Sequence, residues 1–480
     1  MRILAAAIVV LSIGVVNLIA TTRAGDWPQF RGQNAAGIAV SSAKLPAEIG
    51  PDSNVIWKTA LPPGHSSPVV FGGHIYLNAV ENEELLVMGL DRSNGNVLWK
   101  TKVPHERLEE IHRIGSHAQC TPAADGQRVV SFFGSAGLVC HDRNGELLWR
   151  RPMGPFKNTF GAGSSPLIVD DRIILCQDHD TDSFLMAFDK QTGKPLWKTD
   201  RSEFPRNYGT PVIWSVAGKK QIVVAATLRV VGYDFDTGEE LWTARGIARF
   251  VSTTPVIGSD NTLYVAGWAA GGDEGGMKIE APPFDDVVAE YDKNQNRTFE
   301  ESELPEGGAI HMRFAQVDRD KSGGVSREEY EYFRKLLQVG RNVVIAVRPG
   351  GKGDVTDTHI VWTYARHVPF CASPVIVDDL LFSVKDGGVV SCLMAKTGTA
   401  LKQGRLEAVG EYYSSPVAGD GKIYLLSEDG QLTVISSVAD WKILHTAAFG
   451  ENTYATPAIV DGQIFLRTAG HLYCFGIGEE

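Results

Sequence analysis

The sequence predicts an all-β protein, an eight-bladed β-propeller that is closed by an N-terminal strand and carries a small α-helical insertion in its fifth blade. Three observations predict this fold. A Ser/Thr-Pro step precedes an apolar strand eight times, a turn followed by tryptophan recurs after it, and the last repeat lacks a strand that the N-terminus supplies. Because one small four-stranded sheet cannot bury both faces, we expect the repeats to pack radially against one another.

The first 24 residues read as an export signal. A basic start at Met1-Arg2 is followed by an apolar run over residues 3–20 and by the small residues Thr22 and Ala24. This order is typical of a signal peptide cleaved after Ala24. The apolar run is also just long enough to remain as a membrane anchor. We therefore expect a periplasmic or secreted protein, with no other segment that spans a membrane.

The Ser/Thr-Pro steps divide the chain that follows into eight repeats. Successive prolines lie 41 to 54 residues apart, except for one interval of 119 residues. The steps are SSPVV (66–70), CTPAA (120–124), SSPLIV (164–169), GTPVIW (209–214), TTPVIG (253–258), ASPVIV (372–377), SSPVAG (414–419) and ATPAIV (455–460). Alternating apolar residues between Gly, Asp and Asn turns predict four short antiparallel strands in each repeat.

The fourth predicted strand of a repeat carries a tryptophan. In DRSNGNVLW, HDRNGELLW, FDKQTGKPLW and DFDTGEELW, the tryptophan stands four residues after the turn glycine, at Trp99, Trp149, Trp197 and Trp242. The eighth repeat, residues 455–476, stops after three strands, and SNVIWKTAL around Trp57 supplies the missing one. Pairing of this strand with the last repeat would close the ring and remove an exposed sheet edge.

These motifs resemble a known family. Ser/Thr-Pro followed by an Asp-x-x-x-Gly turn and tryptophan every 40 to 45 residues is similar to the pyrroloquinoline-quinone-type, tryptophan-docked propeller repeats, and DWPQFRG (26–32) resembles the start of exported bacterial members. The resemblance covers most of the chain outside residues 273–340. It implies the propeller fold. The family includes quinone-dependent alcohol dehydrogenases and a non-catalytic scaffold, the outer-membrane assembly lipoprotein, so it leaves the function open.

The long interval contains an acidic insertion, which divides the mature chain into propeller segments 25–272 and 341–480 around residues 273–340. Two twelve-residue loops in the insertion have the oxygen spacing of paired EF-hands. Calcium takes side-chain oxygens from positions 1, 3 and 5, a carbonyl from position 7 and a bidentate carboxylate from position 12. The predicted ligands are Asp292, Asn294, Asn296, Thr298 and Glu303 in loop one (292–303), and Asp318, Asp320, Ser322, Gly324 and Glu329 in loop two (318–329).

The two predicted calcium sites are not equal. Loop two has Gly323 at position six, where the backbone needs a positive φ, whereas loop one has Arg297 there. A left-handed conformation costs a non-glycine residue about 1–2 kcal/mol. Loop one also uses neutral amides where loop two has Asp320. We therefore expect tighter calcium binding at loop two. Apolar Phe299 and Val325 at position eight predict a short β contact between the loops.

Chain topology places the elaborations on one face of the disc. Connections between strands two and three of a blade emerge on the same side as the connections between blades. The insertion, the long link 103–119 and the acidic loop DHDTD (178–182) therefore share a face, which we call the working face. Binding residues tend to lie on loops that a rigid scaffold holds. Tolerated surface insertion is the alternative explanation.

Composition limits the possible functions. The net charge of −11 disfavours nucleic-acid phosphates as a partner. The sequence has no Cys-Cys pair, no haem-attachment motif and no recognisable catalytic motif, so we assign no catalytic residue. We therefore expect a monomeric calcium-binding scaffold for a protein or polysaccharide of the cell envelope, and we do not expect pyrroloquinoline quinone. A quinone-dependent dehydrogenase is the alternative.

Overall fold

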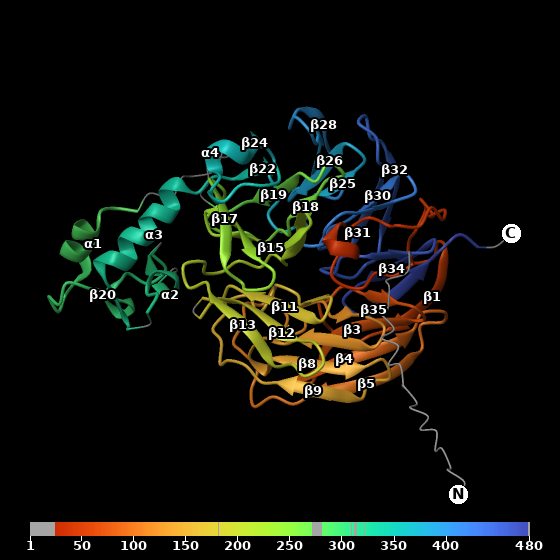
Figure 1. Cartoon of the computed structure of the whole chain (residues 1–480), viewed down its shortest axis with the longest axis horizontal. Helices are drawn as coiled ribbons and strands as arrows, with labels where there is room; N and C mark the ends of the chain where they lie inside the picture. Colours follow the sequence, from red (N-terminus) through yellow and green to blue (C-terminus); the bar gives the residue numbers. More distant parts are fainter. Residues whose placement is uncertain are drawn as a thin grey trace, which may run out of the picture.

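Eight β-sheets surround a central axis in the computed structural model (Figure 1). The structure describes residues 25–180, 182–270, 281–308, 310–311, 314–320 and 322–478. The predicted signal, residues 1–24, and the first part of the insertion therefore lie outside the described residues. Within them, no helix is both long enough and apolar enough to cross a membrane. The predicted fold class, an eight-bladed propeller, is confirmed.

Each blade is a sheet of antiparallel strands in chain order, and most blades have four. Blade one contains β2 (Val69–Phe71), β3 (His74–Glu81), β4 (Glu84–Asp91) and β5 (Val97–Val103). Blade two contains β6 (Ala123–Ala124), β7 (Arg128–Phe132), β8 (Leu138–Asp142) and β9 (Leu147–Arg151). Blade three contains β10 (Leu167–Val169), β11 (Arg172–Gln177), β12 (Phe184–Asp189) and β13 (Pro195–Asp200). Blade four contains β14 (Val212–Val216), β15 (Lys219–Ala226), β16 (Arg229–Asp234), β17 (Glu240–Arg245) and, as a fifth strand, β23 (Gly353–Asp354). Blade five contains β18 (Val256–Ile257), β19 (Leu263–Gly267), β22 (Val343–Val347) and β24 (Ile360–Tyr364). Blade six contains β25 (Val375–Val377), β26 (Leu380–Lys385), β27 (Val389–Met394) and β28 (Ala400–Arg405). Blade seven contains β29 (Val417–Gly419), β30 (Lys422–Leu426), β31 (Gln431–Ser436) and β32 (Ile443–Ala448). Blade eight contains β33 (Ala458–Val460), β34 (Gln463–Arg467), β35 (His471–Phe475) and the N-terminal strand β1 (Val55–Ala60).

The N-terminal strand closes the ring as predicted. Strand β1 pairs antiparallel with β35, the last strand of the chain, and Trp57 lies opposite Cys474. Figure 1 shows the two ends of the propeller chain side by side at this blade. Without β1, the outer edge of β35 would present unpaired backbone groups to solvent, and such edges invite pairing with other chains. Closure therefore removes an edge that the repeat pattern alone leaves open.

The tryptophan of one blade packs on the turn glycine of the next blade. The Nε1 of Trp99 donates to the carbonyl of Arg143 at 3.0 Å, and its ring lies where a side chain at Gly145 would be. The positive φ of 86° at Gly145 also favours glycine. The same contact joins Trp57 to Gly95. These contacts make the tryptophan motif a device that joins neighbouring blades at the rim.

Blade four departs from this pattern. Short strand β23 pairs in parallel with β17, and Gly353 lies opposite Trp242. Trp242 consequently donates from Nε1 to the Oε1 of Gln221 in its own blade, at 2.7 Å. The segment comes from the connection between β22 and β24, which also forms helix α4 (Thr356–His359). The sequence pattern does not predict this fifth strand.

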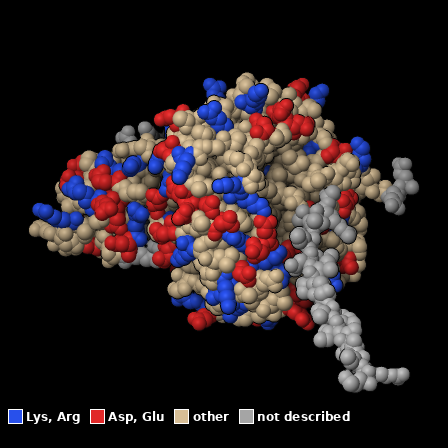
Figure 2. Space-filling view, viewed as in Figure 1, with Lys and Arg blue, Asp and Glu red and all other residues tan. Residues whose placement is uncertain are grey.

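The insertion between β19 and β22 forms a small separate core outside the ring, beyond β17 in Figure 1. Its elements are α1 (Phe284–Tyr291), β20 (Phe299–Glu300), the 3-10 helix η3 (Glu301–Glu303), α2 (Phe314–Val317), β21 (Gly324–Val325) and α3 (Arg327–Val339). Phe299 pairs with Val325 across β20 and β21, which confirms the predicted contact between the loops. Lys, Arg, Asp and Glu side chains of both signs cover its surface (Figure 2).

Two contacts hold the insertion against the propeller. The Tyr332 hydroxyl in α3 donates to the backbone carbonyl of Glu203 at 2.6 Å. The Nη2 of Arg319, in loop two, donates to the carbonyl of Ser202 at 3.2 Å. Both acceptors belong to the link between blades three and four, so the insertion lies against a blade-to-blade connection as the topology predicts.

Candidate functional site: the axial cavity and the insertion loops

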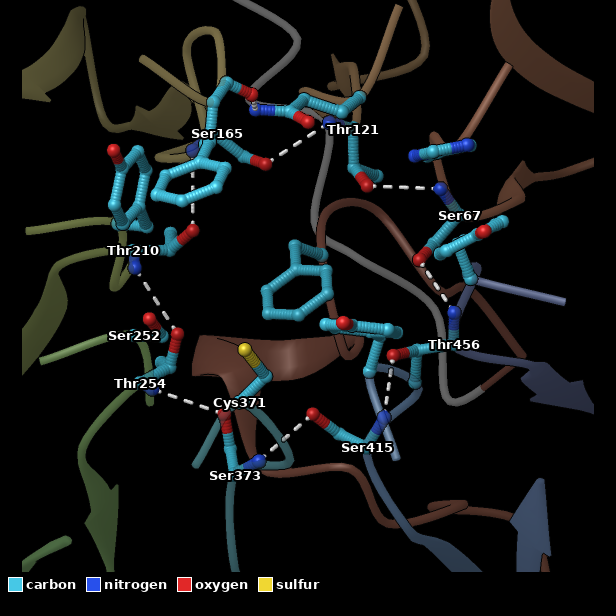
Figure 3. Close-up of a pocket in the computed structure, with 18 of the residues that line it drawn as sticks. Ser67, Thr121, Ser165, Thr210, Ser252, Thr254, Cys371, Ser373, Ser415 and Thr456 are labelled. Atoms are coloured by element: carbon cyan, nitrogen blue, oxygen red, sulfur yellow. Dashed lines mark hydrogen bonds between the residues drawn. The ribbon is translucent and has the colours of Figure 1, made fainter. Parts of the chain in front are cut away.

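Eight hydroxyl side chains, one from each Ser/Thr-Pro step, form a closed circle around the propeller axis (Figure 3). In every blade the backbone N–H of this residue donates to the hydroxyl oxygen of the equivalent residue in the next blade. The N–H to oxygen distances are 3.0 Å for Ser67 to Thr121, 2.9 Å for Thr121 to Ser165, 3.1 Å for Ser165 to Thr210, 3.0 Å for Thr210 to Thr254, 2.9 Å for Thr254 to Ser373, 3.0 Å for Ser373 to Ser415, 3.0 Å for Ser415 to Thr456 and 2.9 Å for Thr456 to Ser67. We call these eight residues the hydroxyl ring.

The hydroxyl ring explains why the motif pairs a hydroxyl residue with proline. The proline has no N–H, so the preceding amide is the donor available at that step, and a side-chain acceptor in the neighbouring blade satisfies it. The sequence pattern marked these positions as strand starts but did not reveal that they bond to one another. Their regular spacing was the signal, because an equivalent position in each blade of a closed ring faces the same axis.

The hydroxyl ring lines an axial cavity of about 190 Å³. The residues two positions before each ring residue surround its mouth: His65, Gln119, Gly163, Tyr208, Ser252, Cys371, Tyr413 and Tyr454. The long link 103–119 adds Ile114 and Gly115. The predicted working face is therefore the face on which the axial cavity has its mouth.

The N-terminal segment crosses the opposite face and closes the floor. Four of its contacts fall on residues three positions after a residue of the hydroxyl ring. Trp27 bridges to Val70, the carbonyl of Pro28 accepts from Ala124, the side chain of Asn34 bonds both backbone groups of Ile213, and Ile38 bridges to Ala418. Phe30, in the same segment, lines the axial cavity. The segment from Trp27 to Ile38 thus acts as a plug across blades that are far apart in sequence.

Aromatic rings form much of the wall above the hydroxyl ring. His65 stacks on Tyr454 with ring centroids 3.9 Å apart, and Tyr413 lies 5.5 Å from Tyr454. On the other side, Tyr208 contacts Phe250 at 5.5 Å. Burial, together with nearby Arg467, lowers the pKa of His65 to about 3, so this imidazole is neutral at physiological pH. The described walls of the cavity are therefore uncharged, with aromatic rings at the mouth and hydroxyl groups deeper inside.

The cavity lining fits a quinone cofactor poorly. Pyrroloquinoline quinone carries carboxylates, which cationic side chains would have to balance, and the family's calcium requires acidic ligands. Among the described residues that line the cavity, none is Asp, Glu, Lys or Arg. Burial raises the pKa of the Cys371 thiol and of the Tyr208 phenol, which keeps these groups neutral as well. We assign no catalytic role to any of them.

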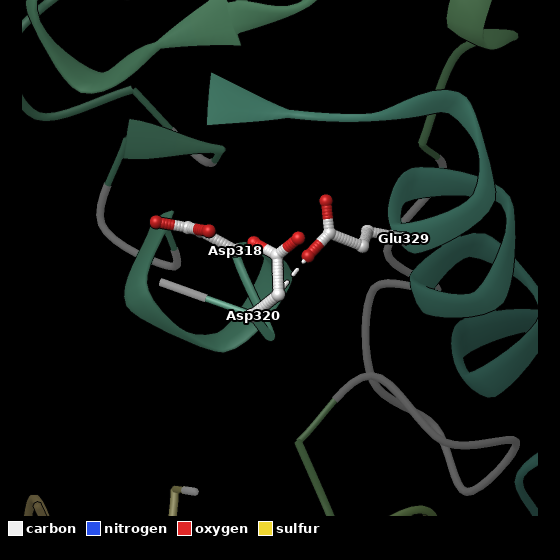
Figure 4. A group of neighbouring side chains, drawn as sticks. All are labelled: Asp318, Asp320 and Glu329. Carbon is white, nitrogen blue, oxygen red and sulfur yellow. Dashed lines mark hydrogen bonds between the residues drawn. The ribbon is translucent and has the colours of Figure 1, made fainter. Parts of the chain in front are cut away.

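Loop two of the insertion brings three predicted ligands together (Figure 4). One carboxylate oxygen each from Asp318, Asp320 and Glu329 lies within 4.8 Å of the others. Glu329 is held by backbone donors: its Oε1 accepts from Arg319 and Asp320 at 2.8 and 3.1 Å. Gly323 has a φ of 87°, as predicted for position six. Ser322 and Gly324 lie in the same loop, where the Ser322 hydroxyl donates to the Gly324 carbonyl at 2.9 Å.

Asp318 is the least satisfied group of this cluster. Its side chain is 8% exposed, and its Oδ1 is buried without a hydrogen-bond partner. Its Oδ2 accepts from the N–H of Gly323 at 3.1 Å. A buried, unpaired carboxylate oxygen next to two further carboxylates is costly unless a cation compensates it.

Loop one has the same outline but different contacts. The Asp292 carboxylate accepts from the backbone of Asn296 and Arg297, and Glu303 accepts from Lys293 and Asn294. Thr298 donates its hydroxyl to the Asn296 Oδ1 at 2.7 Å. Arg297 has a φ of 65°, the left-handed conformation expected at position six.

The Asn side chains of loop one donate to Glu300, a residue that the spacing did not select as a ligand. The Nδ2 atoms of Asn294 and Asn296 lie 2.9 and 2.7 Å from its Oε2 and Oε1. Among the predicted ligands, loop one has the carboxylates of Asp292 and Glu303 only, whereas loop two has those of Asp318, Asp320 and Glu329.

Two acids of the acidic loop, Asp178 and Asp180, are engaged in ion pairs. Asp178 forms a bidentate ion pair with Arg201 at 2.8 and 2.7 Å, and both side chains are buried. Asp180 pairs with Arg206. Since their carboxylates are occupied by these arginines, the two acids tie blade three to the link with blade four. Asp178 and Asp180 are therefore not free to bind a ligand on the working face.

The closed eight-bladed propeller with tryptophan-docked blades and a plugged axial cavity places the chain in a class, the pyrroloquinoline-quinone-like β-propellers. The chain belongs to the family described as outer membrane protein assembly factor BamB, whose model matches residues 48–153, 87–271 and 341–477. The whole insertion, residues 273–340, lies between the matched ranges. No curated protein matches the sequence.

Solved structures share the fold at low sequence identity. BamB from Moraxella catarrhalis is 11% identical with a TM-score of 0.53, covering 88% of this chain and 98% of its own. A europium-containing methanol dehydrogenase is 10% identical with a TM-score of 0.51, covering 96% and 99%. A quinohemoprotein alcohol dehydrogenase from Comamonas testosteroni is 12% identical with a TM-score of 0.51, covering 95% and 81%. These structures include one BamB and two dehydrogenases at 10–12% identity, so the similarity shows the fold and does not decide the function.

Proposed function

We propose that this protein is a calcium-binding, non-catalytic interaction scaffold exported to the cell envelope. The observation that carries the calcium proposal is loop two, where Asp318, Asp320 and Glu329 converge and the buried Oδ1 of Asp318 lacks a donor. A cation between these three carboxylates would compensate the charge that burial makes costly.

The donor set favours calcium among the common cations. Every predicted ligand is a hard oxygen, and the loops contain no His or Cys ligand that zinc or copper would prefer. The Glu329 carboxylate at position twelve is oriented by the Ser326 amide at 2.9 Å and by the Ser326 hydroxyl at 2.7 Å. Backbone donors early in the loop hold its Oε1, and Ser326 late in the loop holds its Oε2. A carboxylate oriented in this way is suited to bind calcium through both oxygens. Loop one would bind a second calcium ion more weakly.

The scaffold role is supported by the axial cavity. A quinone-dependent dehydrogenase, the alternative, requires charged groups around its cofactor, and the described lining of the axial cavity provides none. The family description names an outer membrane protein assembly factor. The insertion, the link 103–119 and the cavity mouth all lie on the working face. We propose that this face docks a protein or polysaccharide of the envelope and that the chain acts as a monomer.

Calorimetric titration of calcium into the mature chain tests the proposal. We expect heat from a tighter site that disappears in Asp318→Ala plus Glu329→Gln, because the double substitution removes two of the three converging carboxylates. Dissociation constants of ~10⁻⁷–10⁻⁵ M would indicate a regulatory site, and ~10⁻⁴–10⁻³ M a permanently filled one outside the cell.

The matched control is Asp286→Asn plus Glu290→Gln on helix α1. Both residues are exposed acids of the insertion that lie outside the loops, so the change in net charge is the same. The control should titrate like the unmodified protein. Absence of heat in the unmodified protein, or an equal loss in both double variants, contradicts a calcium site at loop two.

A further inference from the structure

We infer that the axial cavity binds a single uncharged, polyhydroxylated ring, such as one sugar unit, through its mouth on the working face. This inference deepens the proposed scaffold function by naming the class of ligand, and it does not depend on calcium binding. It rests on the unused hydroxyl groups, the aromatic wall, the absence of charge from the lining and the closed floor.

The hydroxyl ring offers hydrogen bonds that the protein itself does not use. Each ring oxygen accepts one backbone N–H, and all eight side chains are at least 98% buried. No side chain or carbonyl in the described part of the chain accepts their O–H protons. An apolar occupant, such as an aliphatic side chain of a partner, would bury these donors unsatisfied, which is unfavourable. A ligand with several hydroxyl groups would satisfy them as both acceptor and donor.

The wall above the ring suits the apolar faces of such a ligand. The Tyr208 hydroxyl donates to the Asn158 Oδ1 at 3.0 Å, and the Tyr454 hydroxyl donates to the Glu428 Oε1 at 2.6 Å. Tyr413 donates likewise to Glu411. These bonds hold the tyrosine rings in fixed orientations, so little side-chain freedom is lost when a ligand packs against them.

The electrostatics disfavour an ion. No cationic side chain lines the described cavity, so a carboxylate or phosphate would be desolvated without compensation. Outside the lining, Arg467 lies near His65, and behind the tyrosines lie the carboxylates of Glu411 and Glu428. They are already engaged by the phenols, and no acidic group faces a bound cation directly. The occupant is therefore neutral.

The dimensions limit the ligand to one ring. Pockets for drug-sized ligands commonly measure ~300–1,000 Å³, and this cavity of about 190 Å³ is smaller. Phe30 closes the end opposite the mouth, so a long chain cannot thread through the propeller. A free monosaccharide and the terminal unit of a glycan present the same chemistry, and both would enter from the working face.

Saturation-transfer NMR on the whole mature protein tests this inference with D-glucose, D-galactose, N-acetyl-D-glucosamine and maltotriose as probes. D-glucuronate tests for anions, and p-cresol stands for a tyrosine side chain of a protein partner. We expect signals from at least one neutral sugar and weak or no signals from D-glucuronate and p-cresol. Saturation confined to the terminal ring of maltotriose would identify a glycan end as the source, whereas monosaccharide signals alone would identify the free sugar.

Cys371→Trp should block the cavity, because Cys371 lines the mouth two residues before Ser373. Cys371→Ser is the matched control that keeps the cavity open. We expect at least a tenfold lower sugar signal in Cys371→Trp and an unchanged signal in Cys371→Ser. Ser252→Phe, which fills the same mouth from blade five, is a second blocking variant if the first does not fold.

Sugar signals that persist in the folded blocking variants, or the absence of signals from all neutral sugars, would overturn the inference. Stronger signals from p-cresol or D-glucuronate would overturn it as well, in favour of a protein side chain or an anion. Calcium titration of the same variants separates the two proposals, since blocking the cavity should leave loop two unchanged.

Discussion

The backbone N–H of Thr456 donates to the hydroxyl of Ser67 at 2.9 Å, across 389 residues of sequence. This bond joins blade eight to blade one and completes the hydroxyl ring. Strand β1 closes the same junction at the rim by pairing with β35. The ring is therefore closed twice, by hydrogen bonds at the axis and by a strand near the outside.

Thr210→Val should destabilise the protein by about 1–3 kcal/mol, because it removes the acceptor of the buried Ser165 amide and leaves that donor unsatisfied. Guanidinium unfolding monitored by fluorescence measures the change in the free energy of unfolding. Thr446→Val, on the exposed outer strand β32, is the matched control and should change stability by less than about 0.5 kcal/mol. Equal effects of the two substitutions would mean that the ring bond contributes nothing measurable.

Gly145→Ala should destabilise the protein more than Gly218→Ala does. Both glycines have a positive φ, 86° and 77°, so both substitutions incur a backbone cost of about 1–2 kcal/mol. A methyl group at Gly145 would also lie 2.5 Å from the ring of Trp99, whereas nothing lies within 4 Å at Gly218. Displacement of Trp99 should add about 1–3 kcal/mol, measured by chemical unfolding. A Gly145→Ala cost no larger than that of the control would exclude a role for tryptophan docking in stability.

Arg297→Gly should tighten calcium binding at loop one. Arg297 has a φ of 65°, and calcium binding fixes the loop in this conformation, so removing a backbone cost of about 1–2 kcal/mol should raise the affinity by up to roughly tenfold. The measurement is calorimetry in the Asp318→Ala plus Glu329→Gln background, where loop one alone remains.

Arg297→Ala in the same background is the control for this prediction, since it removes the same charge but keeps a Cβ atom. It should give a smaller gain than glycine. Equal gains from the two substitutions would assign the effect to the arginine charge rather than to the backbone conformation.

Several features of the fold follow from short stretches of sequence. Strand ends follow from Ser/Thr-Pro and Asp-x-x-x-Gly because these residues restrict the backbone locally, and the count of eight follows from their repetition. The closing role of SNVIWKTAL follows from counting strands. Position six of each insertion loop has the positive φ that the oxygen spacing predicts, at Arg297 as well as at Gly323.

Other features depend on groups that the sequence does not place near one another. Gln221 receives the Trp242 hydrogen bond because β23 occupies the outer edge of blade four. Glu300 enters loop one through the side chains of Asn294 and Asn296. The partners of Asp178 and Asp180 are arginines from a link more than 20 residues away. No local periodicity encodes such pairs.

The sequence by itself determined the repeat, the number of blades, the closing strand and the place of the insertion, because each is set by backbone preferences within a few residues. Only the tertiary structure decided that the eight hydroxyl residues form one ring, that Phe30 lines its floor and that the cavity carries no charge among its described residues. These properties arise when the ring closes, since closure brings one residue from every blade to a shared axis.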